Sequence, residues 1–552
     1  MTDPYKLTDN FKRKPITKII GNMGLVAVAL KELRVREIID SIIPKLGPNV
    51  KVSHGQAVEA FILNSLNCDS RPLYLMRTAL MSLDLDRMIG CSAEDFNDDI
   101  LGRTLDALWE CEDGVSGVFE AIAVPAAKKS GYEGQLCKLH VDSTSFHYDG
   151  KGSDEPEAVK ITYGYSRDCH PELKQVMLQM ITASFGTSGV GFPLAIRPLD
   201  GNSNDQKTFA DGIEDANRLK DCLMGAPGCE YLVADCAMYT ESNLKKAREK
   251  GVHLVTRAPN KLAEVRKRIK ENLGSLKEFG DGHEGKIIEV EHYGSKQKWL
   301  IVKTRQAAAR TKSAMDRGIK ASLKKAQDAV NGAMKSGPFS CLPDAEKAAA
   351  ALAAKKFDYH TVEVSAEEEP YYTKRGPHSE KNKAVRWVLK AEIKENAEAI
   401  REESDFIGTF VIATTDAGRD WTEQELLDGY KSQQAVERGF RYLKDPMFFT
   451  SALFLEKPSR VEALLMIMTL ALLVYSYLEH KIRNTLKEKG MLWPNQAGRM
   501  VKNPTLRMMF DYYRNAMSVY YGGRSEVSLV LFEQGITLLG ILGKEYEKMY
   551  DV

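Results

Sequence analysis

The chain of 552 residues lacks the cysteine spacing of a disulfide-rich or zinc-ribbon protein. Its nine cysteines are odd in number and include no CxxC pair. This usage argues against a disulfide framework and favours a reducing, cytoplasmic location. The N-terminal segment also lacks an apolar run followed by a small-residue cleavage site, so we expect no signal peptide.

The sequence has no apolar run long enough to cross a membrane. Its most strongly apolar stretch, Ala463–Leu478, has 16 uncharged residues between Glu462 and Glu479. A helix that spans a bilayer needs about 20 apolar residues. We therefore expect a buried core helix here and no membrane association.

A net charge of one sign is also missing, because 77 basic residues are balanced by 76 acidic ones. Any nucleic-acid surface must then come from local segregation of charge. Residues 245–270 contain ten Lys/Arg and two Glu, and residues 303–325 contain eight Lys/Arg and one Asp. Such segments are either solvated helix faces or surfaces for a phosphate backbone, and charge alone does not decide between them.

A chain of this length predicts two to four domains. Residues 1–130 have helical periodicity, as in Val52–Leu66, and we expect an all-helical N-terminal domain that binds DNA. Residues 131–257 then change to strand and helix patterns. We expect strands at 135–148, 175–185, 191–199, 230–235 and 252–257, and helices at 205–223 and 240–250. This order is typical of a mixed α/β sheet flanked by helices.

The α/β pattern is interrupted over residues 258–404, which combine a basic helical part with strand-like pieces. This segment is too long for a plain loop, so we predict an inserted subdomain of mixed strands and helices. The α/β domain is expected to resume over 405–552, with a strand at 405–415, a helix at 422–444 and buried helices to the C-terminus. Thr422 and Glu425 have the spacing of a capping box at the start of that helix.

Two carboxylates stand at or near the ends of predicted strands: Asp142 in HVDST and Asp235 in LVADC. Taken alone, each fits a turn former or a helix cap, which is the commoner role of Asp at such places. His140 and His147 flank Asp142, and we expect them to be ordinary strand residues.

A single helix over 422–444 would align polar side chains along one edge. At about 100° per residue, an arc of roughly 60° contains Tyr430, Gln433, Glu437 and Lys444. Arg441 lies roughly 40° beyond Glu437. A neighbouring apolar stripe, expected to dock onto the sheet, contains Val436, Phe440 and Leu443. The alternative for Glu437 is an i, i+4 ion pair with Arg441 on an exposed face.

The segment from Tyr430 to Lys444 resembles the signature of DDE-type insertion-sequence transposases. The signature reads Tyr, two residues, Arg, three residues, Glu, six residues, Lys, and Gln433 stands here in place of the Arg. Further segments resemble the same group in the same order: His140–Thr144, Gly164–Gln175, Gly201–Asp205 and Val233–Asp235. The resemblance covers roughly residues 135–257 and 405–480, with a weaker similarity at the N-terminus.

The resemblance implies a ribonuclease H-like catalytic core. Asp142 would lie on its first strand, Asp235 just after its fourth strand and Glu437 on a later helix, and these three would be the catalytic residues and metal ligands. Two Mg²⁺ ions are expected, with Mn²⁺ able to substitute, because paired divalent ions serve in-line displacement at phosphorus and Mg²⁺ prefers oxygen ligands. The expected DNA contacts are Tyr430, Gln433, Arg438, Arg441, Lys444 and Lys174.

The function implied is cut-and-paste transposition, in which the enzyme cuts double-stranded DNA at terminal inverted repeats and joins the ends to target DNA. A homodimer on the DNA is expected, in the cytoplasm and associated with the nucleoid of a prokaryote. Two alternatives stay open from the sequence. One is a nuclease of the same fold that does not transfer strands, and the other is a transposase-derived DNA-binding protein without catalytic activity.

Overall fold

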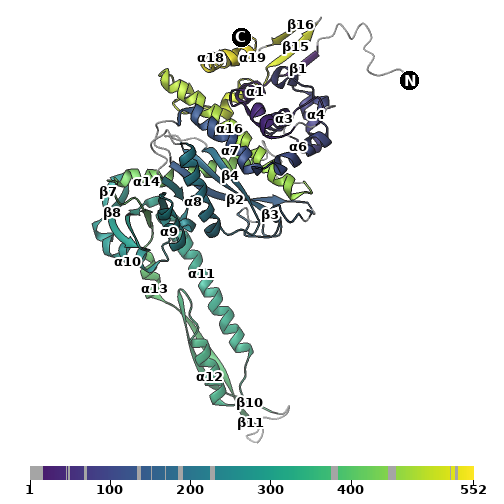
Figure 1. The fold of residues 1–552 in the computed structure, drawn as a ribbon. Helices are drawn as coiled ribbons and strands as arrows, with labels where there is room; N and C mark the ends of the chain where they lie inside the picture. Colours follow the sequence, from purple (N-terminus) through teal and green to yellow (C-terminus); the bar gives the residue numbers. More distant parts are fainter. Residues whose placement is uncertain are drawn as a thin grey trace.

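The computed structural model describes residues 16–552, apart from 45–46, 48–49, 68–70, 133–137, 151, 154, 168–169, 185–190, 224–230, 374–382, 446–454, 522–523 and 529–532. A helical body lies above a large mixed sheet, and a long arm extends from the far side of that sheet (Figure 1). Some predictions lie outside the described residues: the segment before residue 16, the start of the strand expected at 135–148, and residues 168–169 of the Gly164–Gln175 motif.

The central sheet has nine strands in the order β4-β3-β2-β5-β6-β12-β9-β8-β7. Its strands are β2 (Lys138–Tyr148), β3 (Lys174–Ser184), β4 (Phe192–Leu199), β5 (Tyr231–Ala234), β6 (His253–Ala258), β7 (Lys277–Gly280), β8 (His283–His292), β9 (Ser295–Lys303) and β12 (Thr409–Thr414). Strands β2, β3 and β4 are antiparallel neighbours, whereas β2, β5 and β6 run parallel. This half of the sheet has the predicted ribonuclease H-like arrangement.

Helices cover both faces of the sheet. On one face lie α8 (Asp205–Cys222) and α9 (Glu241–Glu249), and Gly212 of α8 comes close to the side chain of Val141. On the other face lie α14 (Glu423–Lys431), which contacts β5 and β6, and α15 (Gln434–Leu443), which contacts β2 and β3. Side chains alternate across a strand, so even-numbered β2 residues such as Asp142 lie on the face of α15.

The helical body is built from both ends of the chain. Its helices are α1 (Met23–Glu32), α2 (Val35–Ile42), α3 (His54–Leu66), α4 (Leu73–Met81), α5 (Leu85–Ile89), α6 (Asp98–Glu110), α7 (Gly114–Ala127), α16 (Pro458–Glu488), α17 (Leu506–Asp511), α18 (Glu533–Leu542) and α19 (Lys544–Met549). The hydroxyl of Tyr550 donates to the Gly21 carbonyl at 2.6 Å and accepts from the Leu25 N–H at 3.2 Å. The two termini therefore form one packed unit.

The expectation of an all-helical N-terminal region and a helical C-terminus was incomplete. The short strand β1 (Ile16–Ile19) pairs with β15 (Met517–Tyr521), which pairs with β16 (Arg524–Ser528). A second small sheet joins β13 (Trp493–Pro494) to β14 (Met500–Val501). The β1 signal is weak because four residues are too few for a period, and the partner of β1 lies almost 500 residues away in the sequence.

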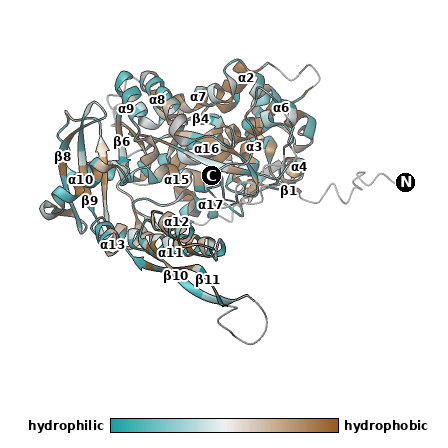
Figure 2. Cartoon of the chain, turned by 90° about the horizontal axis from the view of Figure 1, so that it is seen from below, coloured by the Kyte–Doolittle hydropathy of each residue, from teal (hydrophilic) through white to brown (hydrophobic). Residues whose placement is uncertain are grey.

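Helix α16 is the core helix of the body, as its apolar sequence predicts. It contacts α1, α3, α6, α7 and β4, and 94% of its most apolar window is buried. By length and composition alone it could cross a membrane, yet its side chains are covered by protein. Hydrophobic colouring is concentrated around α16 and α3 in Figure 2.

The segment 258–404 is not one separate subdomain. Strands β7 to β9 belong to the central sheet, because β9 pairs with β12 and β8. Helix α10 (Ala263–Asn272) buries Val265 and Ile269 in the same core. The remainder forms the arm, defined here as α11 (Arg305–Lys335), α12 (Leu342–Ala353) and the hairpin of β10 (His360–Tyr372) and β11 (Lys383–Glu395) (Figure 1). Helix α13 (Ala397–Ser404) leads back to β12.

Candidate active site

Asp142 lies in the middle of β2 with its carboxylate on the face of α15. The side chain is 13% exposed, and Oδ1 accepts from the Ser143 N–H at 2.8 Å and from Arg167 Nη1 at 3.3 Å. Burial is the main reason that the pKa of Asp142 is raised to about 6. Arg167 and the Ser143 N–H oppose this rise in the pKa, and the Asp235 carboxylate adds to it.

Asp235 reaches the same place through the register of the parallel strands. His140 pairs with Val233 between β2 and β5, so two residues further along Asp235 stands beside Asp142. Neighbouring strands are about 4.8 Å apart. The Asp235 carboxylate caps the turn Cys236–Met238 by accepting from the Ala237 N–H at 2.9 Å. Asp235 therefore caps this turn, as one interpretation of the sequence predicted, and also stands beside Asp142.

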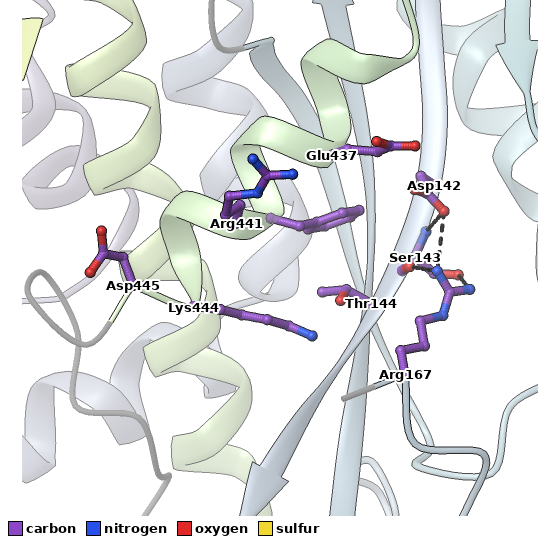
Figure 3. A pocket seen from close by; sticks show the side chains of 9 residues that line it. Asp142, Ser143, Thr144, Arg167, Glu437, Arg441, Lys444 and Asp445 are labelled. Carbon is purple, nitrogen blue, oxygen red and sulfur yellow. Dashed lines mark hydrogen bonds and ion pairs between the residues drawn. The ribbon is translucent and has the colours of Figure 1, made fainter. Parts of the chain in front are cut away.

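Glu437 is presented by the first turn of α15. The predicted apolar stripe of this helix is confirmed, since Val436, Phe440 and Leu443 are buried where α15 packs on β2 and β3. Glu437 itself is exposed, and its carboxylate points across the cleft toward Asp142 (Figure 3). The alternative ion pair with Arg441 does not occur in the described part of the chain. Glu437 is thus available to a ligand in the cleft.

The single helix predicted over 422–444 is broken between α14 and α15. Around the junction, three N–H groups bond three residues back: Gln433 to Tyr430, Ala435 to Ser432, and Val436 to Gln433. Such 3₁₀ geometry turns the chain by about 120° per residue in place of 100°. Gln433 therefore points in a different direction from the one that a single continuous helix would give it, and it does not share the polar edge with Glu437 and Lys444.

Gln433 is buried, with 7% of its surface exposed, and it faces the end of β5. With its amide oriented to satisfy both partners, Nε2 donates to the Ala234 carbonyl at 3.2 Å and Oε1 accepts from the Asp235 N–H at 3.1 Å. The structure therefore does not support the predicted DNA contact for Gln433. It joins the start of α15, which carries Glu437, to the backbone of Asp235.

The cleft between β2 and α15 has a volume of about 630 Å³. It is lined by Asp142, Ser143, Thr144, Arg167, Glu437, Phe440, Arg441, Lys444 and Asp445. Lys444 lies over the Phe146 ring, with Nζ 5.8 Å from the ring centroid, and extends into the cleft (Figure 3). Arg441 is exposed on the same wall. Carboxylates and cations thus share one open site.

The other predicted DNA contacts lie at different distances from this cleft. Burial raises the pKa of Tyr430 to about 12, and the carboxylates of Asp235 and Glu437 contribute, so its hydroxyl lies within their electrostatic reach. Arg438 is exposed on α15 but is not among the residues that line the cleft. Lys174 pairs with Tyr148 at the far end of β2, about 20 Å along the strand from Asp142. Lys174 is thus outside the cleft.

Arg167 lines the cleft but was not among the site residues expected from the sequence. Its guanidinium bonds Asp142, the Ser143 carbonyl and, at 3.2 Å, the Ser143 hydroxyl. The resemblance of Gly164–Gln175 to a family motif marked the segment that contains Arg167. This residue lies in a loop, however, and a loop has no repeating pattern of residues from which the orientation of a side chain could be predicted. His140 is a buried strand residue, as expected, and burial lowers its pKa to about 3.

The donor set of the site fits a divalent cation that prefers oxygen. Asp142, Asp235 and Glu437 supply carboxylate oxygens from three elements, and a positive charge beside Asp142 stabilises its buried carboxylate. Arg167 supplies that charge in this structure. Among the described residues, no three His, Cys, Asp or Glu side chains are close enough to form a closed metal site. An ion at this site would complete its coordination with water and DNA phosphate, as Mg²⁺ commonly does.

Comparison with protein families identifies the chain. The family model for the transposase DDE domain matches residues 133–474, which include all three carboxylates. The chain belongs to the DDE transposase family. A domain of unknown function, DUF4277, matches residues 16–124 of this transposase, which correspond to the N-terminal helices of the body. The match to the DDE domain also spans the arm, so the arm lies within the family domain.

Comparisons with single proteins and solved structures support the family assignment less strongly than the family model does. No curated protein matches the transposase. A similar solved structure is the synaptic complex of the piggyBac transposase with hairpin DNA, at 10% identity and a TM-score of 0.35. The similarity covers 87% of this chain and 79% of that chain. A TM-score of this size adds no argument to the family match.

Proposed function

We propose that this transposase cuts double-stranded DNA at the ends of an insertion sequence and joins those ends to target DNA. The observation that carries the proposal is the grouping of three carboxylates: Asp142 and Glu437 line one open cleft, and the strand register places Asp235 beside Asp142. They come from β2, from the end of β5 and from α15, so only the assembled core brings them together. Membership of the DDE transposase family supports the same reaction class.

The three carboxylates would hold two Mg²⁺ ions, or Mn²⁺ in their place. When bound, such ions lower the pKa of an attacking water or 3′-hydroxyl and stabilise the leaving oxygen. The protein residues orient the DNA. Lys444 and Arg441 lie on the α15 wall together with Glu437, opposite Asp142, and a phosphate backbone can lie between the two walls. These contacts would position the scissile phosphate without reading the bases.

Gln433 has a positioning part in this proposal. Its two bonds to the end of β5 connect the backbone of Asp235 with the first turn of α15. Because Val436, Phe440 and Leu443 anchor α15 on the sheet, the Glu437 carboxylate is kept opposite Asp142. A metal at Asp142 would compete with Arg167, which bonds Asp142 Oδ1 in this structure.

The partners proposed are the terminal inverted repeats and the target DNA, bound by a homodimer that brings two ends together. The location proposed is the cytoplasm, at the nucleoid of a prokaryotic cell. Short inverted repeats on both sides of the gene would supply the natural substrate for the assays below. Footprinting on those repeats, with and without Mg²⁺, measures whether the transposase selects them.

The test of cleavage compares Asp142→Asn with Asp428→Asn, a matched change on the exposed surface of α14. Cleavage of supercoiled DNA carrying the repeats is measured in Mg²⁺ and in EDTA. We expect Asp142→Asn to lower the cleavage rate by about 10³-fold or more at unchanged DNA binding, and Asp428→Asn to cleave like the wild type. Full cleavage by Asp142→Asn would show that the metal assignment is wrong.

A second assay separates transposition from simple hydrolysis. Pre-cut ends with a free 3′-hydroxyl are mixed with a target plasmid in Mg²⁺. Joined products are expected from the wild type and from Asp428→Asn. Cleavage without any joined product would favour the nuclease alternative, and binding without either reaction would favour the catalytically inactive alternative.

A further inference from the structure

The two basic segments of the sequence have different surroundings in the structure. In the segment 245–270, five of the ten cations pair with carboxylates: Lys245 with Glu249, Lys246 with Glu214, Arg266 with Glu403, Arg268 with Glu264, and Lys270 with Glu402. In the segment 303–325, none of the eight cations has a carboxylate partner within the described part of the chain. Half of the cations in the first segment are thus paired with carboxylates, whereas those of the second segment are not.

Seven of those eight cations lie on α11, the long helix of the arm. The helix packs through one narrow face, on which Ser322, Ala326 and Val330 are its buried residues. On the opposite side of the helix, cations gather within an arc of roughly 80°, taking about 100° per residue. They are Arg310, Arg317, Lys320, Lys324 and Lys335. These five exposed residues are named the α11 stripe. Asp328 lies at the edge of the stripe, and Asp316 lies outside it.

The other cations of the arm provide an internal comparison. On β11, Arg386 pairs with Glu369 at 2.5 Å, Lys390 with Glu367 at 3.2 Å, and Lys394 with Glu363. Cross-strand pairing thus neutralises the hairpin, whereas the α11 stripe keeps its charge. The arm also has a core of its own, formed by Ala326, Val330, Leu352 and Val362. Stability of the arm therefore does not require the stripe cations.

We propose that the α11 stripe is a second DNA-binding surface, which contacts the phosphate backbone of duplex DNA away from the catalytic cleft. The choice of DNA as partner rests on the proposed function. Along the helix the stripe extends from Arg310 to Lys335, about 38 Å, which matches roughly 11 base pairs of duplex at 3.4 Å per pair. The cations are spaced along this length on one face, as contact with a backbone requires. No base-reading contact is implied.

The start of the arm is connected rigidly to the catalytic sheet. Thr304 follows β9 directly and caps α11 by accepting from the Ala307 N–H at 3.0 Å, and its own N–H donates to the Gly408 carbonyl at 3.0 Å. Gly408 precedes β12 and donates its N–H to the Thr311 hydroxyl at 2.9 Å. Because these bonds fix the base of α11 to two strands of the sheet, DNA held by the stripe keeps a defined position relative to the cleft.

The test uses two triple variants with the same change in composition. The stripe variant is Arg317→Gln, Lys320→Gln and Lys324→Gln, and the control variant is Arg386→Gln, Lys390→Gln and Lys394→Gln on β11. Each removes one Arg and two Lys from the arm. Binding of a 40-base-pair duplex without terminal repeats is measured by fluorescence anisotropy across a range of salt. Circular dichroism and thermal melting verify that both variants fold.

For the stripe variant we expect a dissociation constant at least about tenfold weaker at 0.1 M salt. The slope of log K against log salt should fall by about 3, because each lost phosphate contact removes about 0.9. The hydroxyl-radical footprint of the full-length transposase should shorten on one side. The control variant should bind like the wild type, and a folded stripe variant with unchanged affinity and slope would overturn the proposal.

Two further outcomes separate this proposal from others. If the stripe variant binds DNA normally but loses self-association in analytical ultracentrifugation, the stripe contacts a protein and the proposal is wrong. Cleavage at saturating DNA should stay within about twofold of the wild type in the stripe variant, because the stripe lies outside the cleft. A failure of Asp142→Asn to stop cleavage would refute the catalytic assignment and leave the DNA-binding result for α11 unaffected.

Discussion

Replacing Gln433 tests how the structure couples two catalytic carboxylates. In Gln433→Ala, the Ala234 carbonyl and the Asp235 N–H each lose a buried partner, at 3.2 and 3.1 Å in the wild type. An unsatisfied buried group costs about 1–3 kcal/mol, so the two together weaken the junction by about 2–6 kcal/mol. The neighbouring Gln434 is exposed and has no such contacts, which makes Gln434→Ala the matched control.

The assay is amide hydrogen exchange of a peptide that contains Asp235, combined with the cleavage rate. A local loss of about 1.4 kcal/mol corresponds to a tenfold change in an equilibrium. We therefore expect the Asp235 amide to exchange at least about tenfold faster in Gln433→Ala. Cleavage should fall by about 10²-fold, because a displacement of about 1 Å in a catalytic group has an effect of that order.

The controls make this prediction specific. Gln434→Ala should match the wild type in both measurements. Gln433→Glu keeps an acceptor for the Asp235 N–H but brings a second oxygen toward the Ala234 carbonyl, so it should restore the exchange rate only in part. Unchanged exchange and cleavage in Gln433→Ala would mean that Gln433 does not hold the end of β5, and the coupling argument would fail.

Two further predictions concern the cleft without metal. The pKa of Asp142 is raised from 3.8 to about 6, so ionisation of this carboxyl removes up to about 3 kcal/mol of native stability as the pH rises from about 4 to 6. Asp142→Asn should therefore raise the melting temperature of the metal-free protein above pH 6 and leave it unchanged below pH 4; a lower melting temperature at pH 7 would contradict this. Arg167→Gln should strengthen Mn²⁺ binding in the absence of DNA, measured by electron paramagnetic resonance, because the guanidinium bonds the same Asp142 oxygen that a metal needs. Weaker binding would instead assign Arg167 a supporting part in the metal site.

The strands that carry the site could be predicted from the sequence because their signals are local. Alternation in β2 and the short apolar run of β5 predicted both strands, and their ends agree with the structure to within a few residues. The register that brings Asp142 beside Asp235 was not visible in the same way. It depends on hydrogen bonds between segments more than 90 residues apart, and no local period records them.

The errors of the sequence analysis have physical causes. Periodicity of apolar residues continues through Ser432 and Gln433, so it predicted one helix where the structure has α14 and α15. The break is stabilised by a contact of Gln433 with β5, a tertiary partner that periodicity does not include. Similarly, the pairing of β8 and β9 with the central sheet joins part of the expected insertion to the core, because an exposed sheet edge gains hydrogen bonds by accepting strands.

The sequence by itself determined which groups can do the chemistry and which secondary structure carries them. Carboxylate identity, capping residues and the periods of strand and helix are properties of near neighbours in the chain, so Asp142, Asp235 and Glu437 could be placed on their elements. Only the tertiary structure decided that Arg167 contacts Asp142 and that Gln433 faces inward. It also decided which basic segment keeps its charge, because ion pairs with distant segments neutralise part of the charge of α9 and α10, whereas the stripe cations of α11 form no ion pair within the described residues.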